Sequence, residues 1–253
     1  MEKISFFCYY SEMDNEPRPF FFSFIIPAHN EEKYIGKTLE HINKLAYPKS
    51  AFEVWVIENG STDRTFDVAK KFAGENTMIL SAPEKGVSKA KNFGMEKISP
   101  RSEWVIFLDA DAIVEENFLS GLNKFLLSNA SKNLAIGTTS IGPFENRDWY
   151  ARIWFWLYDI GHKYTETSYT IQIMNAKLRD KVRFDRELSL AEDLKFIKDC
   201  LLFGEFFFWK TDTVRTSTRR FDQIGWVTLF ATWNWDALMW KFNKKKKEYP
   251  VIR

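Results

Sequence analysis

The chain is short of several features, and each shortage excludes a class of protein. It has two cysteines among 253 residues, Cys8 and Cys200, so no disulfide framework is expected and a reducing compartment is the default. No apolar run reaches the roughly 18 residues that a transmembrane helix needs. The N-terminus lacks the basic and apolar regions of a secretory signal, so we expect a cytoplasmic protein. A net charge of +2 gives no reason to expect a nucleic-acid partner.

Aromatic residues, by contrast, are abundant. They make up 17% of the chain, with ten tryptophans and 24 phenylalanines, which is more than one core of this size usually needs. The hydrophobic fraction of 45% and the charged fraction of 28% are those of an ordinary globular protein. At this length, the chain forms either one large domain or two small ones.

Short apolar runs alternate with helical patterns over the first part of the chain. The predicted strands are Phe20–Ile26, Glu53–Ile57, Thr77–Leu80, Trp104–Leu108 and Leu134–Ser140. The predicted helices between them are Glu31–Leu45, Thr62–Phe72, Gly86–Ile98 and Glu115–Leu127. Because strands separated by helices of about a dozen residues form βαβ units, this pattern predicts an α/β fold. We expect a mainly parallel, Rossmann-like sheet flanked by helices, followed by a half of mixed strands and helices packed on the same sheet.

The fourth predicted strand carries the clearest chemical signal. Residues 104–111 read WVIFLDAD, so a run suited to a strand buried on both faces leads directly into Asp109 and Asp111. Two carboxylates this close repel each other unless a cation lies between them, and oxygen ligands of this kind suit Mg²⁺ or Mn²⁺. The alternative is a plain turn at the end of a strand that caps the next helix.

Three other polar loops follow predicted strands. They read PAHNEE at 27–32, ENGSTD at 58–63 and PEKG at 83–86. The carboxyl ends of parallel strands meet at one edge of a sheet, and helix N-termini there favour anions, so a nucleotide diphosphate site is predicted. Each loop also has a purely structural interpretation. Asn30, Ser61 or Thr62 can cap a helix, Gly60 can supply a turn, and Lys85 can be a solvated charge.

These loops resemble the motifs of a known family. IIPAHNEEKYIGKTLEHI, VIENGSTDRT, EKGVSKAKNFG, FLDAD and LAEDLKF are similar, in that order, to the motifs of inverting family 2 glycosyltransferases with the GT-A fold. The resemblance covers about residues 20–225. It implies transfer of a sugar from a nucleotide-sugar donor to an acceptor hydroxyl or phosphate, with a divalent cation, Mn²⁺ or Mg²⁺.

The resemblance also implies roles for individual residues. Asp111 is implied as the closer metal ligand, Asp109 as its partner in the metal–diphosphate motif, and Asp193 as the general base. The residues implied or expected to bind the donor are Pro27, His29, Glu31, Asn59, Asp63, Lys85, Asp109 and Arg220.

Two departures from the family pattern affect the choice of nucleotide. His29 stands where the family usually has an aromatic, which suggests weaker stacking on the base. Asn59 stands where the family often has an Asp, and an amide donates as well as accepts, so the base preference cannot be transferred. UDP is the first choice, with GDP and dTDP as alternatives.

The predicted base and the predicted diphosphate clamp each have a structural alternative. Glu192 and Asp193 are adjacent, so on a helix at Ala191–Phe203 their side chains point about 100° apart and one of them faces the site. The pair can also be a first-turn acidic cluster that favours the helix dipole. If the acceptor is a phosphate, no base is needed and Asp193 orients it instead. The Arg219-Arg220 pair can clamp a diphosphate or form surface ion pairs.

The prediction of the acceptor depends on two aromatic segments. Asp148–Ile160 and Gly225–Phe242 both look helical with aromatics around most faces, and the second leads into Lys244–Lys247. Trp, Tyr and lysine clusters favour anionic bilayer surfaces, which predicts peripheral contact with the inner face of the membrane and a lipid-linked acceptor. Core packing or a homodimer interface are the alternatives. A sugar or protein acceptor also stays open, and the absence of the processive branch's Gln/Arg-x-x-Arg-Trp motif favours single-sugar transfer.

With the resemblance, the chain divides into four parts. These are an N-terminal extension at 1–19, a nucleotide-sugar-binding βαβ half at 20–140, an acceptor-side catalytic half at 141–225, and an aromatic and basic C-terminal helix and tail at 226–253. A dinucleotide dehydrogenase is excluded because no G-x-G-x-x-G follows the first strand. A nucleotidyltransferase is disfavoured because PAHNEE replaces the Gly-rich basic loop. A non-catalytic nucleotide-sugar binder or scaffold stays open.

Overall fold

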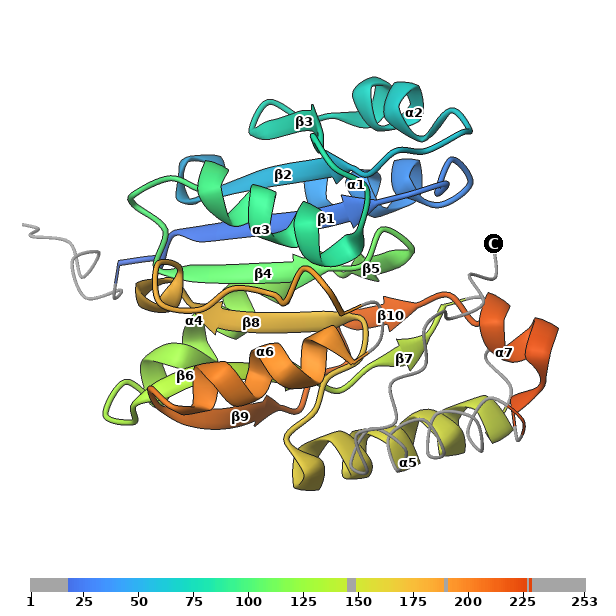
Figure 1. Cartoon of the computed structure of the whole chain (residues 1–253). Helices are drawn as coiled ribbons and strands as arrows, with labels where there is room; N and C mark the ends of the chain where they lie inside the picture. The colour runs from blue at the N-terminus through green and yellow to red at the C-terminus, as the bar shows by residue number, and fades with distance from the viewer. Residues whose placement is uncertain (1–17, 145–148, 189–190, 227, 229–253) are drawn as a thin grey trace, which may run out of the picture.

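The computed structural model describes residues 18–144, 149–188, 191–226 and 228, and its centre is a seven-stranded sheet (Figure 1). The strand order is β3-β2-β1-β4-β8-β6-β9. The strands are β1 (Phe22–Ala28), β2 (Phe52–Glu58), β3 (Thr77–Ser81), β4 (Trp104–Leu108), β6 (Leu134–Thr139), β8 (Ile171–Asn175) and β9 (Glu205–Trp209). Only β8 runs antiparallel to its neighbours in this sheet. The predicted mainly parallel α/β fold is therefore confirmed.

A smaller sheet lies beside the carboxyl end of β4. It is three-stranded, in the order β5 (Ala112–Val114), β10 (Val214–Thr216) and β7 (Gly142–Pro143). Strand β5 begins one residue after Asp111 and pairs antiparallel with β10, which lies about 100 residues away in the sequence. The Asp109–Asp111 segment is therefore a turn between two strands and does not lead directly into a helix.

Helices cover both faces of the large sheet. They are α1 (Ile35–Asn43), α2 (Thr65–Phe72), α3 (Val87–Lys97), α4 (Phe118–Ser128), α5 (Trp149–Thr165), α6 (Glu192–Leu201) and α7 (Arg219–Ile224), with short 3₁₀ turns η1 (Lys49–Ala51) and η2 (Ala176–Leu178). The first buried cluster joins one face of the sheet to α1, α2 and α4, and the second joins the other face to α3 and α6.

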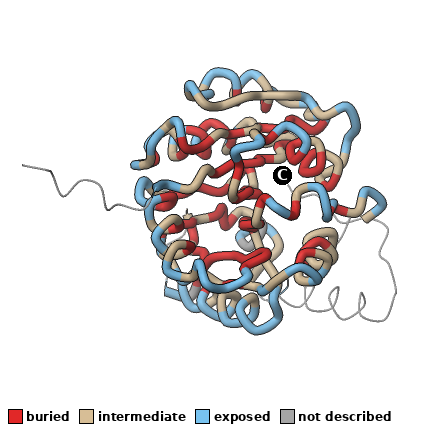
Figure 2. The backbone as a smooth tube through the Cα atoms, turned by 90° about the vertical axis from the view of Figure 1, so that its left-hand side faces the viewer, coloured by how far each residue is buried: buried red, intermediate tan, exposed pale blue. Residues whose placement is uncertain are grey.

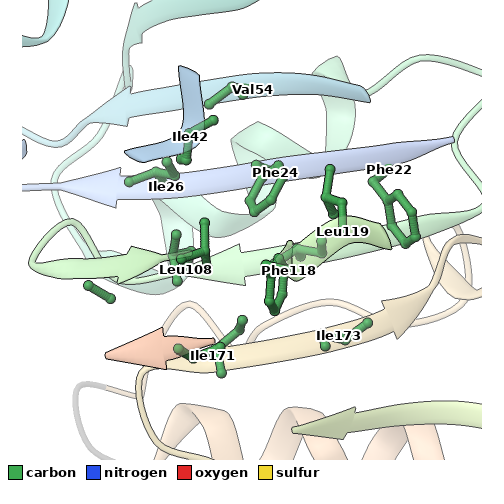
Figure 3. Close-up of a cluster of buried hydrophobic side chains, with 14 of the residues drawn as sticks. Phe22, Phe24, Ile26, Ile42, Val54, Leu108, Phe118, Leu119, Ile171 and Ile173 are labelled. Carbon is green, nitrogen blue, oxygen red and sulfur yellow. The ribbon is translucent and has the colours of Figure 1, made fainter. Parts of the chain in front are cut away.

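Alternation of side chains along β1 explains the two clusters. Phe24 and Ile26 of β1 belong to the first cluster, whereas Ile25 between them belongs to the second. Figure 3 shows the first cluster, in which Phe24 and Phe118 bring β1 and α4 together. All five residues of β4 are buried, as expected for a strand covered on both faces. The burial pattern in Figure 2 accordingly places the buried backbone in the interior and the exposed backbone mainly at the periphery.

The predicted starts of α1 and α2, like that of α4 (Phe118 instead of Glu115), lie three or four residues too early. Helix α1 begins at Ile35, because the carbonyl of Glu31 accepts from the N–H groups of Tyr34 and Ile35 in a preceding turn. Helix α2 begins at Thr65, and neither Ser61 nor Thr62 caps it. The corrections to α1 and α2 have the same cause: the residues at the start of each predicted helix belong to loops that bond to each other.

The exposed aromatic helix α5 forms the outer wall of the second half (Figure 1). Its inner side packs through Ala151 and Phe155, which are buried. Its outer side exposes large apolar residues, with Trp149 at 74% and Tyr164 at 76% relative exposure. None of the helices in the described part of the chain is both long and apolar enough to span a bilayer.

Close packing of α3 on β1 yields the first testable prediction. A Cβ on Gly94 would lie 2.5 Å from Ile25 Cγ2, so α3 could not keep its place on the sheet. Gly94→Ala should lower the free energy of unfolding by about 1–3 kcal/mol through overpacking. Urea denaturation measures the change.

Gly161→Ala is the matched control, because no atom lies within 4 Å of the added Cβ and the residue is inside α5. It should be neutral or stabilising by up to about 1 kcal/mol, the helix-propensity difference between the two residues. Equal effects of the two substitutions would contradict the close-packing argument.

Candidate active site

The loops after β1 and β2 lie side by side at the carboxyl edge of the sheet, near β5, β10 and α7 in Figure 1. Asn59 N–H donates to the carbonyl of Ala28 at 2.8 Å, which continues the strand pairing into the loops. Asn30 N–H donates to the Ser61 hydroxyl at 3.0 Å, and the Asn30 side chain accepts from Thr62 N–H at 2.7 Å. Asn30 therefore joins the two loops instead of capping a helix.

The third loop is fastened to the second through Asn59. The side-chain oxygen of Asn59 accepts from Gly86 N–H at 2.7 Å, immediately before α3 begins. Lys85 is exposed, and its stem lies over Gly60, 3.7 Å from where a Cβ would be. The left-handed φ of Gly60, 70°, explains why a glycine suits this turn. Hydrogen bonds thus hold the loops after β1, β2 and β3 together, and we call these three loops the rim.

Three further residues predicted to bind the donor lie on this rim. Pro27 is in β1 opposite Ile57 of β2, and His29 follows the strand; both are partly buried. Asp63 accepts from the N–H and hydroxyl of Thr65 and from Glu32 N–H. Burial alone would raise the pKa of Asp63, but these hydrogen bonds outweigh it and lower the pKa. Asp63 therefore stabilises the start of α2 as an ionised carboxylate.

The turn that carries the two predicted metal ligands is rigidly held. Asp109 N–H donates to the carbonyl of Thr170 at 3.0 Å. The buried Thr38 hydroxyl lies 2.8 Å from the carbonyl of Ala110 and 2.7 Å from that of Ala112. The Thr38 hydroxyl of α1 and the backbone of Thr170, before β8, therefore fix the backbone of the turn that carries the two carboxylates.

Asp111 is paired with a residue that the predictions did not select. Arg219, at the start of α7, lies 3.0 Å from Asp111 Oδ2 and donates to both carboxylate oxygens of Glu31 at 2.8 and 2.7 Å. The guanidinium also lies 4.7 Å from the ring centre of Tyr34, and 9% of the Arg219 side chain is exposed. One buried cation thus joins the first loop to the metal motif.

The predicted clamp residue is the neighbour of this cation. The backbone of Arg220 lies in α7, and its side chain is outside the described residues. Burial opposes the charge of Arg219, but the hydrogen bond to Glu31 and the charge of Asp111 outweigh it and raise the pKa of Arg219. Adjacent residues on a helix point about 100° apart, so the Arg-Arg pair in the sequence did not reveal which of the two would meet Glu31 and Asp111.

Asp193 is held by another residue that the predictions missed. Lys91 of α3 lies with its Nζ 2.6 Å from Asp193 Oδ1, at the start of α6. Burial opposes the charge of Lys91, but the charges of Asp193, Glu192 and Asp109 outweigh it and raise the pKa of Lys91. Burial, followed by the charge of Asp193, raises the pKa of Glu192 to about 7. The only feature of the sequence that could have indicated a role for Lys91 was its position inside the EKGVSKAKNFG motif.

The donor set suits a divalent cation that is shared with a substrate. Among residues 18–144, 149–188, 191–226 and 228, no group of three His, Cys, Asp or Glu side chains is arranged to hold a metal by itself. Mg²⁺ and Mn²⁺ are commonly held by one or two carboxylates together with substrate phosphates. Asp109 and Asp111 on their rigid turn fit that pattern.

Comparison with known proteins identifies the family. Residues 23–185 match the family model described as glycosyl transferase family 2. The chain belongs to this family. The matched region contains the first four of the five motifs and ends before Glu192 and Asp193.

Two curated relatives from this comparison show the extent of the similarity. The chain is 31% identical over 118 residues to the poly(ribitol-phosphate) beta-N-acetylglucosaminyltransferase TarS of Staphylococcus aureus (strain Mu50 / ATCC 700699), covering 46% of this chain and 20% of TarS. It is 37% identical over 103 residues to the dolichyl N-acetyl-alpha-D-glucosaminyl phosphate 3-beta-D-2,3-diacetamido-2,3-dideoxy-beta-D-glucuronosyltransferase of Methanococcus voltae, covering 39% of this chain and 32% of that protein. The chain thus spans a third or less of the length of these relatives.

Solved structures show the same fold. The structure of S. aureus TarS 1–349 in complex with UDP-GlcNAc aligns with a TM-score of 0.63 at 22% identity, covering 78% of this chain and 58% of that one. The mannosyltransferase PcManGT from Pyrobaculum calidifontis, in complex with GDP-Man and Mn²⁺, aligns with a TM-score of 0.59 at 18% identity, covering 79% and 57%. This family 2 chain therefore has the predicted GT-A fold.

The Arg219 ion pairs yield the second prediction. Arg219→Gln should lower the free energy of unfolding by about 3–5 kcal/mol, because it leaves the mostly buried carboxylates of Glu31 and Asp111 without their cation. Urea denaturation measures the loss.

Arg215→Gln is the control, since Arg215 pairs with Glu115 at 2.8 Å and about a third of each side chain is exposed. An exposed pair of this kind contributes about 0–1 kcal/mol. A loss for Arg219→Gln no larger than for the control would show that the buried cluster is not stabilising.

Proposed function

We propose that this chain is an inverting glycosyltransferase that moves one sugar from a nucleotide-sugar donor to an acceptor. One observation carries the proposal. The β4–β5 turn and the start of α6 are both joined by ion pairs to the rim or to the helix that follows it: Arg219 pairs with Asp111 and with Glu31 of the first loop, and Lys91 of α3 pairs with Asp193. Inverting transfer requires a group that stabilises the leaving diphosphate and a base for the acceptor, and these two sets of carboxylates supply both.

The donor is proposed to bind on the rim formed by the loops after β1, β2 and β3. The residues proposed to bind it are Pro27, His29, Glu31, Asn59, Asp63, Lys85, Asp109 and Arg220, with Arg219 added because it faces Asp111. The rim amides at the start of α3 and the cation Arg219 suit a diphosphate. UDP is the first candidate, supported by the UDP-GlcNAc complex of TarS, and GDP and dTDP are the alternatives.

Asp109 and Asp111 would hold a Mn²⁺ or Mg²⁺ ion. When bound, such an ion neutralises the negative charge that grows on the leaving diphosphate. The chain's own residues orient the reaction: Arg219 and Glu31 position the first loop next to the metal motif, and Asp193 takes the proton of the acceptor hydroxyl. If the acceptor is a phosphate, Asp193 orients it without taking a proton.

The base is tested by one substitution and a control on the same helix. Asp193→Asn should lower kcat by about 10²–10⁴-fold, because a general base acts in the transition state, while nucleotide affinity stays near the wild-type value. Asp199→Asn, which removes an α6 carboxylate paired with Lys195 at 2.8 Å, should retain kcat. The measurement is nucleotide release from a panel of nucleotide-sugars with acceptor extract and Mn²⁺.

The metal is tested in the same assay. Asp111→Asn and excess chelator should each abolish transfer. Full activity in either case would contradict the proposal of a catalytic metal ion. Nucleotide binding without release under all conditions would support the alternative of a non-catalytic nucleotide-sugar binder.

A lipid-linked acceptor at the inner face of a membrane is the second part of the proposal. Helix α5 presents one exposed face with spacings of three, four and seven residues, formed by Trp149, Ile153, Trp156, Leu157, Ile160 and Tyr164. Arg152 and Lys163 are exposed on the same helix, and aromatic rings beside basic groups suit an anionic bilayer surface. The C-terminal segment first predicted for this role, including Lys244–Lys247, lies mostly outside the described residues. The name of the Methanococcus relative, a transferase for a dolichyl-linked sugar phosphate, supports such an acceptor.

Vesicle binding tests this part. Wild-type protein should bind anionic vesicles in a salt-sensitive manner, and Trp149→Ser with Trp156→Ser should weaken that binding. Leu202→Ser, which changes a residue 79% exposed immediately after α6, should leave it unchanged. If the wild-type protein does not bind vesicles, and the double variant is monomeric where the wild type is a dimer, the α5 face is a homodimer interface.

A further inference from the structure

A buried ion pair connects the nucleotide half to the helix that carries the proposed base. Lys91 Nζ lies 2.6 Å from Asp193 Oδ1, and 4% of the lysine side chain is exposed against 31% of the aspartate. The lysine is therefore enclosed by protein, while the carboxylate it holds still reaches the surface. A buried ammonium is stable only with a partner, so the pair strongly restricts where Asp193 can lie.

The surroundings of Lys91 leave it little freedom. Its ammonium lies 4.7 Å from the ring centre of Phe184, and that ring stacks on Phe196 of α6 at 3.7 Å between centres. The next residue along α3, Asn92, donates to the carbonyl of Phe184 at 2.8 Å and accepts from its N–H at 2.9 Å. Lys91 and Asn92 thus fasten two different segments of the second half to α3.

The charges in this cluster explain why a cation is needed. Glu192 precedes Asp193 at the start of α6, and Asp109 also influences the charge of Lys91. The ammonium contacts the Asp193 carboxylate, and the charges of Glu192 on α6 and of Asp109 on the β4–β5 turn also favour its charged form. Without it, Glu192 and Asp193 would repel each other at the first turn of the helix.

We propose that Lys91 is a positioning residue that holds the Asp193 carboxylate in the orientation required to meet the acceptor. This inference rests on the proposed function, because it gives Asp193 the role of base. Lys91 acts through Asp193 and does not itself touch the donor or the acceptor. Its burial distinguishes it from Lys89 of the same helix, whose side chain is 30% exposed.

The test uses Lys91→Met, which keeps most of the packing against Phe184 and removes the charge. We expect kcat to fall by about 10–100-fold, since a small misplacement of a reacting group costs that much. The KM for the donor and the Kd for free UDP, or for whichever nucleotide the donor assay selects, should stay within about two-fold. Lys89→Met is the control, because Lys89 pairs with Glu84 at 2.8 Å and both side chains are partly exposed; it should retain wild-type kcat.

A double-mutant cycle separates positioning from a general structural role. In an Asp193→Asn background, Lys91→Met should change kcat by less than about two-fold, because the residue through which Lys91 acts has been removed. Lys91→Arg, which keeps the buried charge, should recover part of the lost kcat. If Lys91→Met does not fold, Lys91→Arg carries the same cycle, with a loss of kcat in the wild-type background and none in the Asp193→Asn background.

Three results would overturn the inference. They are wild-type kcat for Lys91→Met, a loss of nucleotide affinity that matches the loss of kcat, or equal losses in both backgrounds. Failure of the proposed function gives a different pattern, because Asp193→Asn itself would then keep wild-type activity whatever happens at Lys91.

Discussion

The carboxyl ends of neighbouring parallel strands share one edge of the sheet, and the candidate site depends on this constraint. Strands β1, β2 and β4 are adjacent and parallel, so the loops that follow them lie next to each other at the same edge of the sheet. The reversed strand β8 then pairs with β4 and brings Thr170 to the backbone of Asp109. The metal motif is therefore positioned by a backbone hydrogen bond from Asp109 to Thr170 and by the Thr38 hydroxyl, which contacts the carbonyls of Ala110 and Ala112.

Two buried cations also hold distant parts of the candidate site together. Arg219 joins Glu31 to Asp111, and Lys91 joins α3 to Asp193. Each connects a part of the chain before residue 115 to a part after residue 190. The five carboxylates at these places outnumber the two cations, and a diphosphate adds more negative charge. A divalent cation is the simplest way to balance such a site when the donor binds.

The main sheet could be predicted because its signals are local. Trp104–Leu108 is a continuous apolar run that ends in two carboxylates, and the structure has β4 at those same residues. Strand β5 could not be predicted, because its three residues owe their conformation to pairing with β10 about 100 residues later. The starts of α1 and α2 were missed for a similar reason, since contacts between loops decide them.

The two cations were harder to find than the acids. A lysine inside a helical pattern is usually solvated, and nothing near Lys91 in the sequence shows that Phe184 and Asp193 enclose it. The choice between Arg219 and Arg220 depended on the rotation of a short helix, which the sequence does not determine. The aromatic segment of α5 was correctly expected to be helical, but only the structure separates its buried side at Phe155 from its exposed side at Trp156.

The central claim is that this sheet edge binds a nucleotide diphosphate with a divalent cation. It is tested most directly by thermal unfolding with UDP, GDP, dTDP and CDP, each with and without Mn²⁺. A ligand that binds only the folded state raises its stability by RT ln(1 + [L]/Kd), so one nucleotide should raise Tm most and Mn²⁺ should increase that shift. The Mn²⁺-dependent part should vanish in Asp111→Asn. Unchanged Tm with every nucleotide at millimolar concentration, with and without Mn²⁺, would contradict the account.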